Sequence, residues 1–360
     1  MNMFLLAACA LLILLAPFVF DSFGYEKPEK APYKGVITLW NVNAWRTGGS
    51  SLISFLKKRI SEFESNNPYL FIEAYDMTPA EARGAVFEGR TPDLLSYPSG
   101  FEPGFELAPL PAAETVFPRI PDSYPYMCGC YVLMVNTAML DEKGLPVPEG
   151  WGVRPDEFAA IAQYGVAFDS EPGFSPLPAA VLNEYPEETK RLPPLAGPSP
   201  EPSAGAPVYY FSEGLDKFRD GSVCALIASH RQLSDLAQLY LDNGAPQFRA
   251  YALSAYTDMV QLIGAAKCDD PEKAAACSDF AAFLLRPSAQ SRLEAAGVLP
   301  AVRGLEIYKE NECMSAQYTL FCSKTLFAKP AERGYFEELA RKALGGDKKA
   351  LADLRALAGR

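Results

Sequence analysis

The stretch that most constrains the fold is Pro125 to Trp151, which reads PYMCGCYVLMVNTAMLDEKGLPVPEGW. Tyr131 to Val135 is a short apolar run rich in β-formers, and it predicts a buried strand. A single helix is expected next, over Thr137 to Lys143, because Gly144 and then Pro146 follow it in the usual order of a helix stop. The stretch therefore predicts a buried strand, a short helix and a proline-rich exit in close succession.

This order resembles a segment of the extracellular solute-binding proteins of ABC importers, the maltose-binding-protein-like sugar-binding family. There, a strand ending in asparagine is followed by a short helix and then by a Gly-Leu-Pro-x-Pro-x-x-Trp motif. The matching positions here are Leu133, Val135, Asn136, Gly144, Leu145, Pro146, Pro148 and Trp151. The resemblance implies that the strand crosses from one lobe to the other at the back of a ligand cleft.

The chain before this stretch alternates strand and helix patterns. Gly35 to Trp40 and Tyr69 to Tyr75 are apolar β-runs, and between them Ser50 or Ser51 can cap a helix. The apolar residues of that helix fall on one stripe at helical spacing: Leu52, Phe55, Leu56, Ile60 and Phe63. A strand, a helix and a strand in this order predict a βαβ unit and a parallel sheet.

Three later segments also match the family. Thr91 to Tyr97 has a Pro-Asp pair leading into an apolar strand, and Phe218 to Ile227 resembles a turn into a strand that ends at the cleft. Phe283 to Ala301, which reads FLLRPSAQSRLEAAGVLPA, is close to a family signature. Further helices are expected over residues 154–164, after Asp270, and over 331–345 and 347–358. The resemblance covers nearly all of residues 35 to 358.

The fold that the resemblance implies is α/β, with two lobes of the type II periplasmic-binding-protein kind, each discontinuous in sequence. The expected first lobe combines residues 35–122 with 257–305, and the second combines 123–256 with 306–360. Residues 185–207 contain seven prolines. We expect this stretch to be an irregular surface excursion of the second lobe.

Residues 1–20 carry no charged side chain, and most of them are apolar over a length near the lower limit for a membrane-spanning helix. Leu6 to Cys9 resembles a lipoprotein cleavage box, but the apolar run continues through Phe20, which favours an uncleaved membrane anchor. A cleaved secretion signal or a lipid anchor stays open. Residues 21–34 mix prolines with charges and are expected to be a tether. By the positive-inside rule, the lysines of this tether favour the cytoplasmic side for the residues after the anchor. The resemblance instead implies that the folded part of the protein lies at the extracytoplasmic face of the cell membrane.

The composition excludes several classes of function. The chain has 360 residues and a net charge of −11, so it is long enough for two domains and a poor candidate for binding nucleic acid. Motifs of serine hydrolases, zinc proteases and nucleotide-binding loops are absent from the sequence. His230 is the only histidine, which leaves little for acid–base catalysis. We therefore expect neither an enzyme nor a bound cofactor.

The eight cysteines leave seven after the expected anchor, an odd number, so at least one is not paired within the chain. A metal site is not expected, because no two cysteine pairs have zinc-finger spacing. Cys128 and Cys130 are too close in sequence for an unstrained loop. The expected bridges are Cys268 with Cys277 and Cys313 with Cys322. The alternative is that these are buried free thiols.

A sugar-binding cleft needs aromatic faces for the ring and polar groups for its hydroxyls. Because ligands bind at the C-terminal ends of strands in open α/β sheets, loops 41–51 and 97–101 should share one rim. The ring candidates are Trp45, Tyr97, Phe174 and His230. The hydrogen-bonding candidates are Asn41, Asn43, Arg46, Ser99, Glu171 and Arg231. We expect one ring of the first lobe and one of the second to sandwich the ligand and to be exposed when the lobes open.

The resemblance implies a non-catalytic function, the capture of a solute by lobe closure and its delivery to the subunits of an ABC permease. A sugar or oligosaccharide is the expected solute. Two alternatives stay open. One is a membrane-tethered sensor or scaffold of the same fold that transports nothing. The other is an enzyme with Cys128 or Cys130 as the nucleophile, which would require a depressed thiol pKa.

Overall fold

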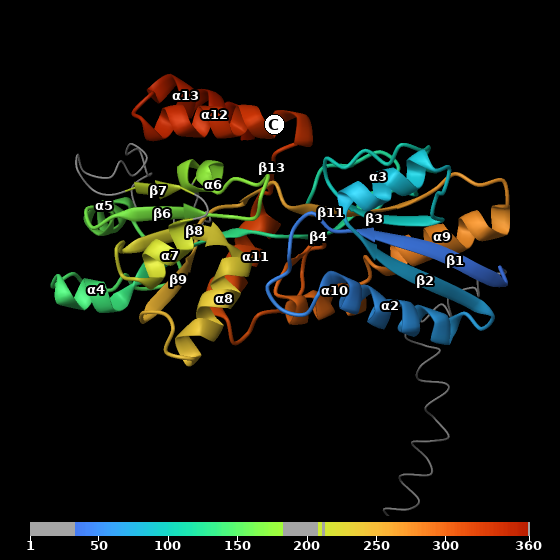
Figure 1. Ribbon diagram of the computed structural model, residues 1–360, viewed down its shortest axis with the longest axis horizontal. Coiled ribbons are helices and arrows are strands. Elements are labelled where there is room, and N and C mark those ends of the chain that lie inside the picture. The colour runs from blue at the N-terminus through green and yellow to red at the C-terminus, as the bar shows by residue number, and fades with distance from the viewer. Residues whose placement is uncertain (1–32, 183–207, 211–212, 359–360) are drawn as a thin grey trace, which may run out of the picture.

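The computed structural model describes residues 33–182, 208–210 and 213–358. This part of the chain forms two large β-sheets with their own helices, which lie side by side along the long axis of the molecule (Figure 1), and a small two-stranded sheet. The expected anchor, the tether up to residue 32 and the proline-rich stretch 185–207 lie outside the described residues. Within the described ranges, no helix combines the length and the apolar character needed to cross a membrane.

The first lobe is built on a six-stranded sheet in the order β12-β4-β11-β3-β1-β2. Its strands are β1 (Gly35–Val42), β2 (Leu70–Met77), β3 (Leu94–Pro98), β4 (Tyr124–Cys128), β11 (Val260–Ala265) and β12 (Leu299–Pro300). β1 is parallel to β2 and β3, as the strand–helix–strand pattern predicts. β11 runs antiparallel to both β3 and β4, and β12 antiparallel to β4. The sheet is therefore mixed, and only part of it is parallel.

Helix α2 (Leu52–Asn66) covers this sheet as its sequence predicts. Ser51 is the N-cap, and its side chain accepts a hydrogen bond from the backbone N–H of Ser54. The buried residues of the helix are the five of the predicted stripe, and burial of each such side chain contributes about 1.5 to 3 kcal/mol. The other helices of this lobe are α3 (Pro79–Phe87), α9 (Pro271–Phe283), α10 (Pro287–Gln290) and the 3-10 helix η3 (Ser291–Ala296).

The second lobe is built on a five-stranded sheet in the order β7-β6-β8-β5-β9. Its strands are β5 (Tyr131–Asn136), β6 (Val166–Asp169), β7 (Val208–Tyr210), β8 (Ala225–Ser229) and β9 (Phe248–Ala252). All six residues of β5 are buried, as predicted, and Asn136 caps the short helix α4 (Thr137–Glu142). The remaining helices are α5 (Pro155–Ala162), α6 (Leu177–Val181), α7 (Gly214–Arg219), α8 (His230–Leu241), α11 (Glu312–Ser323), the 3-10 helix η4 (Pro330–Glu332), α12 (Arg333–Leu344) and α13 (Lys348–Ala358).

The chain passes between the two sheets from β4 to β5, from β9 to β11 and from β12 to α11. The first passage is at Gly129 and Cys130, so the expected crossing strand, Tyr131 to Val135, lies wholly in the second sheet. Residues 124–128 were expected in the second lobe, but they form β4 and pair with β11 and β12 of the first sheet. Both edges of β4 are thus occupied by first-lobe strands, which moves this lobe boundary past Cys128.

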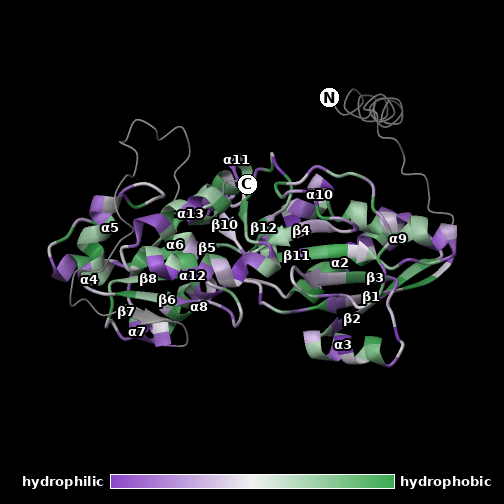
Figure 2. Cartoon of the chain, turned by 90° about the horizontal axis from the view of Figure 1, so that it is seen from above, coloured by the Kyte–Doolittle hydropathy of each residue, from purple (hydrophilic) through white to green (hydrophobic). Residues whose placement is uncertain are grey.

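A short two-stranded sheet of β10 (Tyr256–Thr257) and β13 (Leu326–Phe327) lies at the junction of the lobes. The ring of Tyr256 stacks on Tyr131 of β5 at 6.2 Å and on Phe336 of α12 at 6.0 Å. These contacts fix the C-terminal helices against the junction. Figure 2 shows hydrophobic colour on the central strand β11 and mixed colour on the outer helices, as expected for sheets buried under amphipathic helices.

The expected disulfides are wrong, because all seven cysteines of the described residues are free. Cys313 and Cys322 lie on the same helix, α11, where nine residues span about 13.5 Å. A disulfide needs Cα atoms within about 7 Å. Cys277 lies well inside α9, whereas Cys268 precedes that helix and its thiol donates to the carbonyl of Asp270. Five of the seven are buried thiols, the alternative that the sequence left open.

Candidate functional site at the seam between the lobes

Trp45 and His230 meet where the two lobes face each other, a region we call the seam. Trp45 lies in the loop that follows β1, and its ring contacts the His230 ring edge-on at a centroid distance of 5.7 Å. His230 was expected to end a strand of the second lobe at the cleft; it directly follows β8 but is the first residue of α8 and only 1% exposed. Ser229 ends β8 and caps α8 by accepting from the N–H of Arg231, so the helix starts at once. The two rings are buried against each other.

His230 also touches the passage from the first lobe to the second. Its Nδ1 lies 3.3 Å from the N atom and 3.4 Å from the carbonyl oxygen of Cys130. A Cβ atom on Gly129 would come within 2.6 Å of His230 Cε1, so glycine provides the room for the ring. Burial lowers the pKa of His230 to about 4, and the imidazole is therefore neutral at pH 7.

An ion pair joins the loop of Trp45 to a further segment of the second lobe, the loop after β6. Arg46 Nε lies 3.4 Å from both carboxylate oxygens of Glu171, which follows β6 in the second lobe. Arg46 is 69% exposed and Glu171 is 6% exposed, so solvent screens the pair and it contributes no more than about 1 kcal/mol. Arg231 pairs with Asp235 on its own helix. Burial, together with the nearby charge of Arg46, lowers the pKa of Arg231.

A second group of contacts at the seam centres on Arg333, the first residue of α12. Its Nη2 donates to the carbonyl and to the hydroxyl of Ser99, both at 2.8 Å, and to the carbonyl of Asp258. The guanidinium lies over the ring of Phe174, 4.9 Å from the centroid. Arg333 thus connects the C-terminal helices of the second lobe to the loop after β3 in the first.

Asp258 is buried in the passage between β10 and β11. One carboxylate oxygen accepts from the hydroxyl of Tyr131 at 2.6 Å, and the other accepts from the N–H of Ser175 at 3.0 Å. Burial raises the pKa of Asp258 to about 6, against the lowering effect of these hydrogen bonds. The carboxylate therefore ties the β5 strand and the loop after β6 to the inter-lobe passage.

Three predicted site residues make their contacts within the first lobe. Asn41 Nδ2 donates to Asp76 at 2.7 Å, and Asn43 donates to the same oxygen. The buried hydroxyl of Tyr97 bonds to Ser123 at 2.5 Å. The other seven predicted residues form two groups at the seam. One group is Trp45, Arg46, Glu171, His230 and Arg231, and the other is Ser99 and Phe174 beside Arg333.

Buried polar atoms without a hydrogen-bond partner concentrate at the seam. Among the described residues there are six such side-chain atoms, and only Arg59 Nε lies elsewhere. The five at the seam are Trp45 Nε1, Glu171 Oε1, Ser175 Oγ, His230 Nε2 and Arg333 Nε; Glu171 Oε1 accepts no hydrogen bond but lies 3.4 Å from Arg46 Nε in the ion pair. Each unpartnered group costs about 1 to 3 kcal/mol, and native proteins keep few of them. Their concentration distinguishes the seam from the rest of the described residues.

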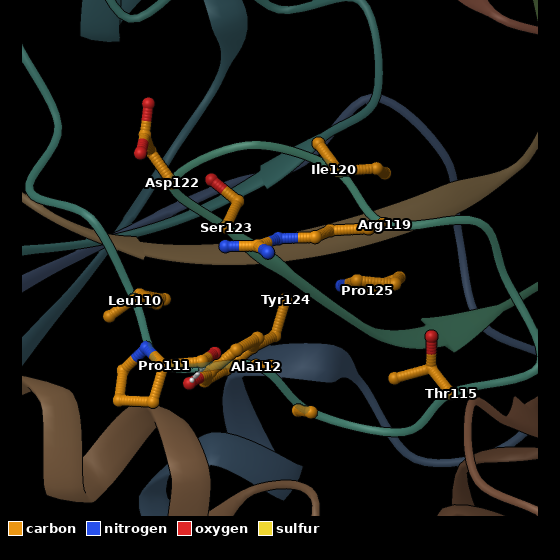
Figure 3. A pocket seen from close by; sticks show the side chains of 11 residues that line it. Leu110, Pro111, Ala112, Thr115, Arg119, Ile120, Asp122, Ser123, Tyr124 and Pro125 are labelled. Carbon is orange, nitrogen blue, oxygen red and sulfur yellow. Dashed lines mark hydrogen bonds between the residues drawn. The ribbon is translucent and has the colours of Figure 1, made fainter.

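A pocket elsewhere in the first lobe is formed by one continuous stretch, residues 110–125, before and within β4 (Figure 3). Arg119, Asp122 and Tyr124 are among the side chains that line it. None of the predicted site residues lies there. The part of the chain that the structure describes contains no group of three histidine, cysteine, aspartate or glutamate side chains that could hold a metal ion.

Arg333, Asp258 and Ser175 were missed from the sequence. Arg333 appears only as one basic residue near the start of a predicted amphipathic helix, which usually means a solvated side chain. Asp258 gives a weak signal, because an acidic residue stands between the aromatic Tyr256 and an apolar strand. Such a position calls for a buried partner of the carboxylate.

No protein-family model matches this sequence, and no curated protein matches it. Among solved structures, the chain is similar to the cyclic α-maltosyl-1,6-maltose binding protein from Arthrobacter globiformis, with a TM-score of 0.59, 14% identity and coverage of 91% of this chain and 98% of that one. It is also similar to the galacto-N-biose/lacto-N-biose I-binding protein of the ABC transporter from Bifidobacterium longum, with a TM-score of 0.57, 14% identity and coverage of 90% and 95%. A third is UgpB from Mycobacterium tuberculosis in complex with glycerophosphocholine, with a TM-score of 0.54, 15% identity and coverage of 91% and 98%.

These similarities show the fold. The chain has the mixed α/β fold of periplasmic binding proteins, and its neighbours in structure include substrate-binding proteins of ABC transporters.

Proposed function

We propose that this protein binds a small polar solute, a sugar or oligosaccharide, at the seam and delivers it to an ABC permease. The observation that carries the proposal is the set of buried polar atoms without a hydrogen-bond partner where the loop of Trp45 in the first lobe faces the loop after β6 and the starts of α8 and α12 in the second. Trp45 supplies an aromatic ring, and Glu171 and Ser175 supply hydrogen-bonding groups, which are the side chains that a sugar requires. The neighbours that bind oligosaccharides support the same class of solute.

Binding would proceed by opening and closing of the lobes about the passages at Gly129 and Asp258. Opening separates the ring of Trp45 from His230 and breaks the ion pair of Arg46. A solute then stabilises the closed arrangement in proportion to its higher affinity for that state. We place this activity at the extracytoplasmic face of the membrane, with residues 1–20 as the anchor.

The test is a thermal-shift screen of sugars and oligosaccharides, followed by calorimetric titration of each hit. A solute at 100 times its dissociation constant adds about 2.7 kcal/mol of stability. The variant Trp45→Phe removes the indole N–H but keeps a ring, so we expect its affinity to fall severalfold. Tyr69→Phe, on an exposed tyrosine of the first lobe, is the control and should bind as the wild type does. A screen without a hit, or equal affinity in Trp45→Phe, would contradict the proposal.

The sensor or scaffold alternative is favoured by a specific observation. Trp45 packs directly on His230, and Arg333 links α12 to Ser99 of the first lobe, so protein contacts alone can hold the lobes together. Hydrogen exchange of residues 43–51 and 170–176 separates the two functions. Transport-type binding predicts protection that increases with solute, whereas a scaffold predicts exchange that no solute changes. The enzyme alternative is weakened, because burial raises the pKa of the Cys128 and Cys130 thiols well above normal.

A further inference from the structure

Arg333 places a guanidinium at the seam among neutral partners. The three acceptors of its Nη2 are two carbonyl oxygens and one hydroxyl, from Ser99 and Asp258. The carboxylate of the neighbouring Asp258 is directed to other groups, Tyr131 and the N–H of Ser175. Within the described ranges, no carboxylate therefore accepts a hydrogen bond from Arg333, although its charge lowers the pKa of the neighbouring Asp258. A cation that is partly removed from water normally has an anionic partner.

Two polar atoms of the residues that contact Asp258 have no hydrogen-bond partner. Arg333 Nε is buried and has no acceptor, and the hydroxyl of Ser175 is buried and unpartnered as well. Ser175 is only 6% exposed. The ring of Phe174 lies against the guanidinium at 4.9 Å and restricts its plane. A guanidinium fixed in this way is suited to carboxylate or phosphate oxygens, to which it donates strong charge-assisted hydrogen bonds.

The five unpartnered atoms of the seam are mostly donors. Trp45 Nε1 and Arg333 Nε can only donate, and Glu171 Oε1 can only accept. His230 Nε2 carries the hydrogen when Nδ1 accepts from the N–H of Cys130, the shorter of its two contacts. Ser175 can do either. A ligand that satisfies this set must offer mainly acceptors, and a carboxylate or phosphate group, whose ionised oxygens only accept, does so more fully than a hydroxyl, which also donates one hydrogen bond.

We infer that the seam takes an anionic solute, a sugar or polyol that carries a carboxylate or a phosphate, and that Arg333 Nε and Ser175 Oγ form the subsite for its charged group. This inference rests on the proposed function and adds the charge of the solute. Trp45 and Glu171 would then contact the polyol part, because the loop of residues 170–176 connects both groups of contacts.

The experiment compares matched pairs of solutes on the full-length protein in mild detergent by calorimetric titration. The pairs are glucose with glucuronate, galactose with galacturonate, and glycerol with glycerol 3-phosphate. We expect the anionic member of at least one pair to bind at least tenfold more tightly. Comparison of the two uronates with glycerol 3-phosphate shows whether the site prefers a carboxylate or a phosphate.

Arg333→Gln should weaken binding of that anion by about tenfold to a hundredfold and leave the neutral member within twofold. Ser175→Ala, which removes a buried hydroxyl without a partner, should weaken the anion severalfold without loss of thermal stability. Arg341→Gln is the control, since it removes the same group from the solvent side of the same helix, and it should change neither affinity.

The outcomes separate the two proposals. Tighter binding of the neutral members, or an equal loss for both members in Arg333→Gln, would overturn the anion subsite and leave solute binding intact. Absence of binding for every pair would count against both. Should Arg333→Gln lower the melting temperature by more than a few degrees, Ser175→Ala decides alone, and unchanged affinity for the anion would refute the subsite.

Discussion

The passage at Gly129 gives the sharpest test of how the seam is held. In Gly129→Ala, the new Cβ would meet His230 Cε1 at 2.6 Å and His230 Nδ1 and Met259 Cε at 3.0 Å. Gly129 is not among the positive-φ glycines, so its backbone conformation accommodates alanine. The loss of stability comes from the contact of the new Cβ with the His230 ring. The terminal methyl group of Met259 can move away, but the His230 ring is held between Trp45 and Cys130. We expect a loss of about 1 to 3 kcal/mol in the free energy of unfolding.

A double-mutant cycle measured by urea denaturation isolates this contact. In the His230→Ala background the ring is gone, and Gly129→Ala should then stabilise by about 0.4 to 1 kcal/mol, because alanine restricts the unfolded chain. Gly84→Ala is the control, since Gly84 lies inside α3 with no atom within 4 Å of the new Cβ. It should stabilise by about 0.5 to 1 kcal/mol in both backgrounds. An equal loss from Gly129→Ala with and without His230 would refute the reasoning.

Three further predictions concern stability and thiol reactivity. Trp45→Ala should lower the free energy of unfolding by about 3 kcal/mol in urea, because the ring is buried. A loss below about 1 kcal/mol would contradict its burial. Acidification from pH 6.5 to 4 has opposite effects through two buried groups. His230 has a pKa of about 4 when folded, so the unfolded chain binds its proton first and the folded state loses stability. Asp258 has a folded pKa of about 6, so the folded chain binds its proton first and gains stability. Asp258→Asn should therefore steepen the acid-side loss in urea titrations, and an unchanged slope would disprove the assignment. Iodoacetamide should modify the partly exposed Cys268 and Cys322 in the native protein before the buried thiols, and mass spectrometry showing another order would contradict this.

Local structure was predictable where one segment carries its own signal. The stripe of α2 and its serine cap could be read directly, since spacing and capping chemistry lie within about 15 residues. Asp270 likewise caps α9, accepting from the N–H groups of Glu272 and Lys273. The buried strand β5 and the asparagine that ends it were also found correctly. These features depend on neighbours in sequence and not on the packing of the lobes.

Features set by long-range pairing were not predictable in the same way. β4 could not be assigned to the first sheet from its own residues, because its partners β11 and β12 are more than 130 residues away in the chain. The disulfides failed for a related reason. The nine-residue spacing of Cys313 and Cys322 looked suitable for a loop, but both residues lie on one helix, which separates them by more than two turns.

The seam shows why a binding site is harder to predict than a strand. Trp45 and His230 were chosen as opposite walls of an open cleft, and the structure brings them together, yet as a ring contact that buries both. Arg333 has no local signal that separates it from a solvated charge, and Asp258 has only a weak one. Both become distinctive because the passages between the lobes bring Ser99 and Ser175 to them. The candidate site is recognised by the polar atoms that have no hydrogen-bond partner after folding, and these atoms cannot be identified from the sequence. The charge of a proposed solute is for this reason better inferred from Arg333 Nε and the hydroxyl of Ser175 than from the ring contact of Trp45 with His230, which the seam makes without a solute.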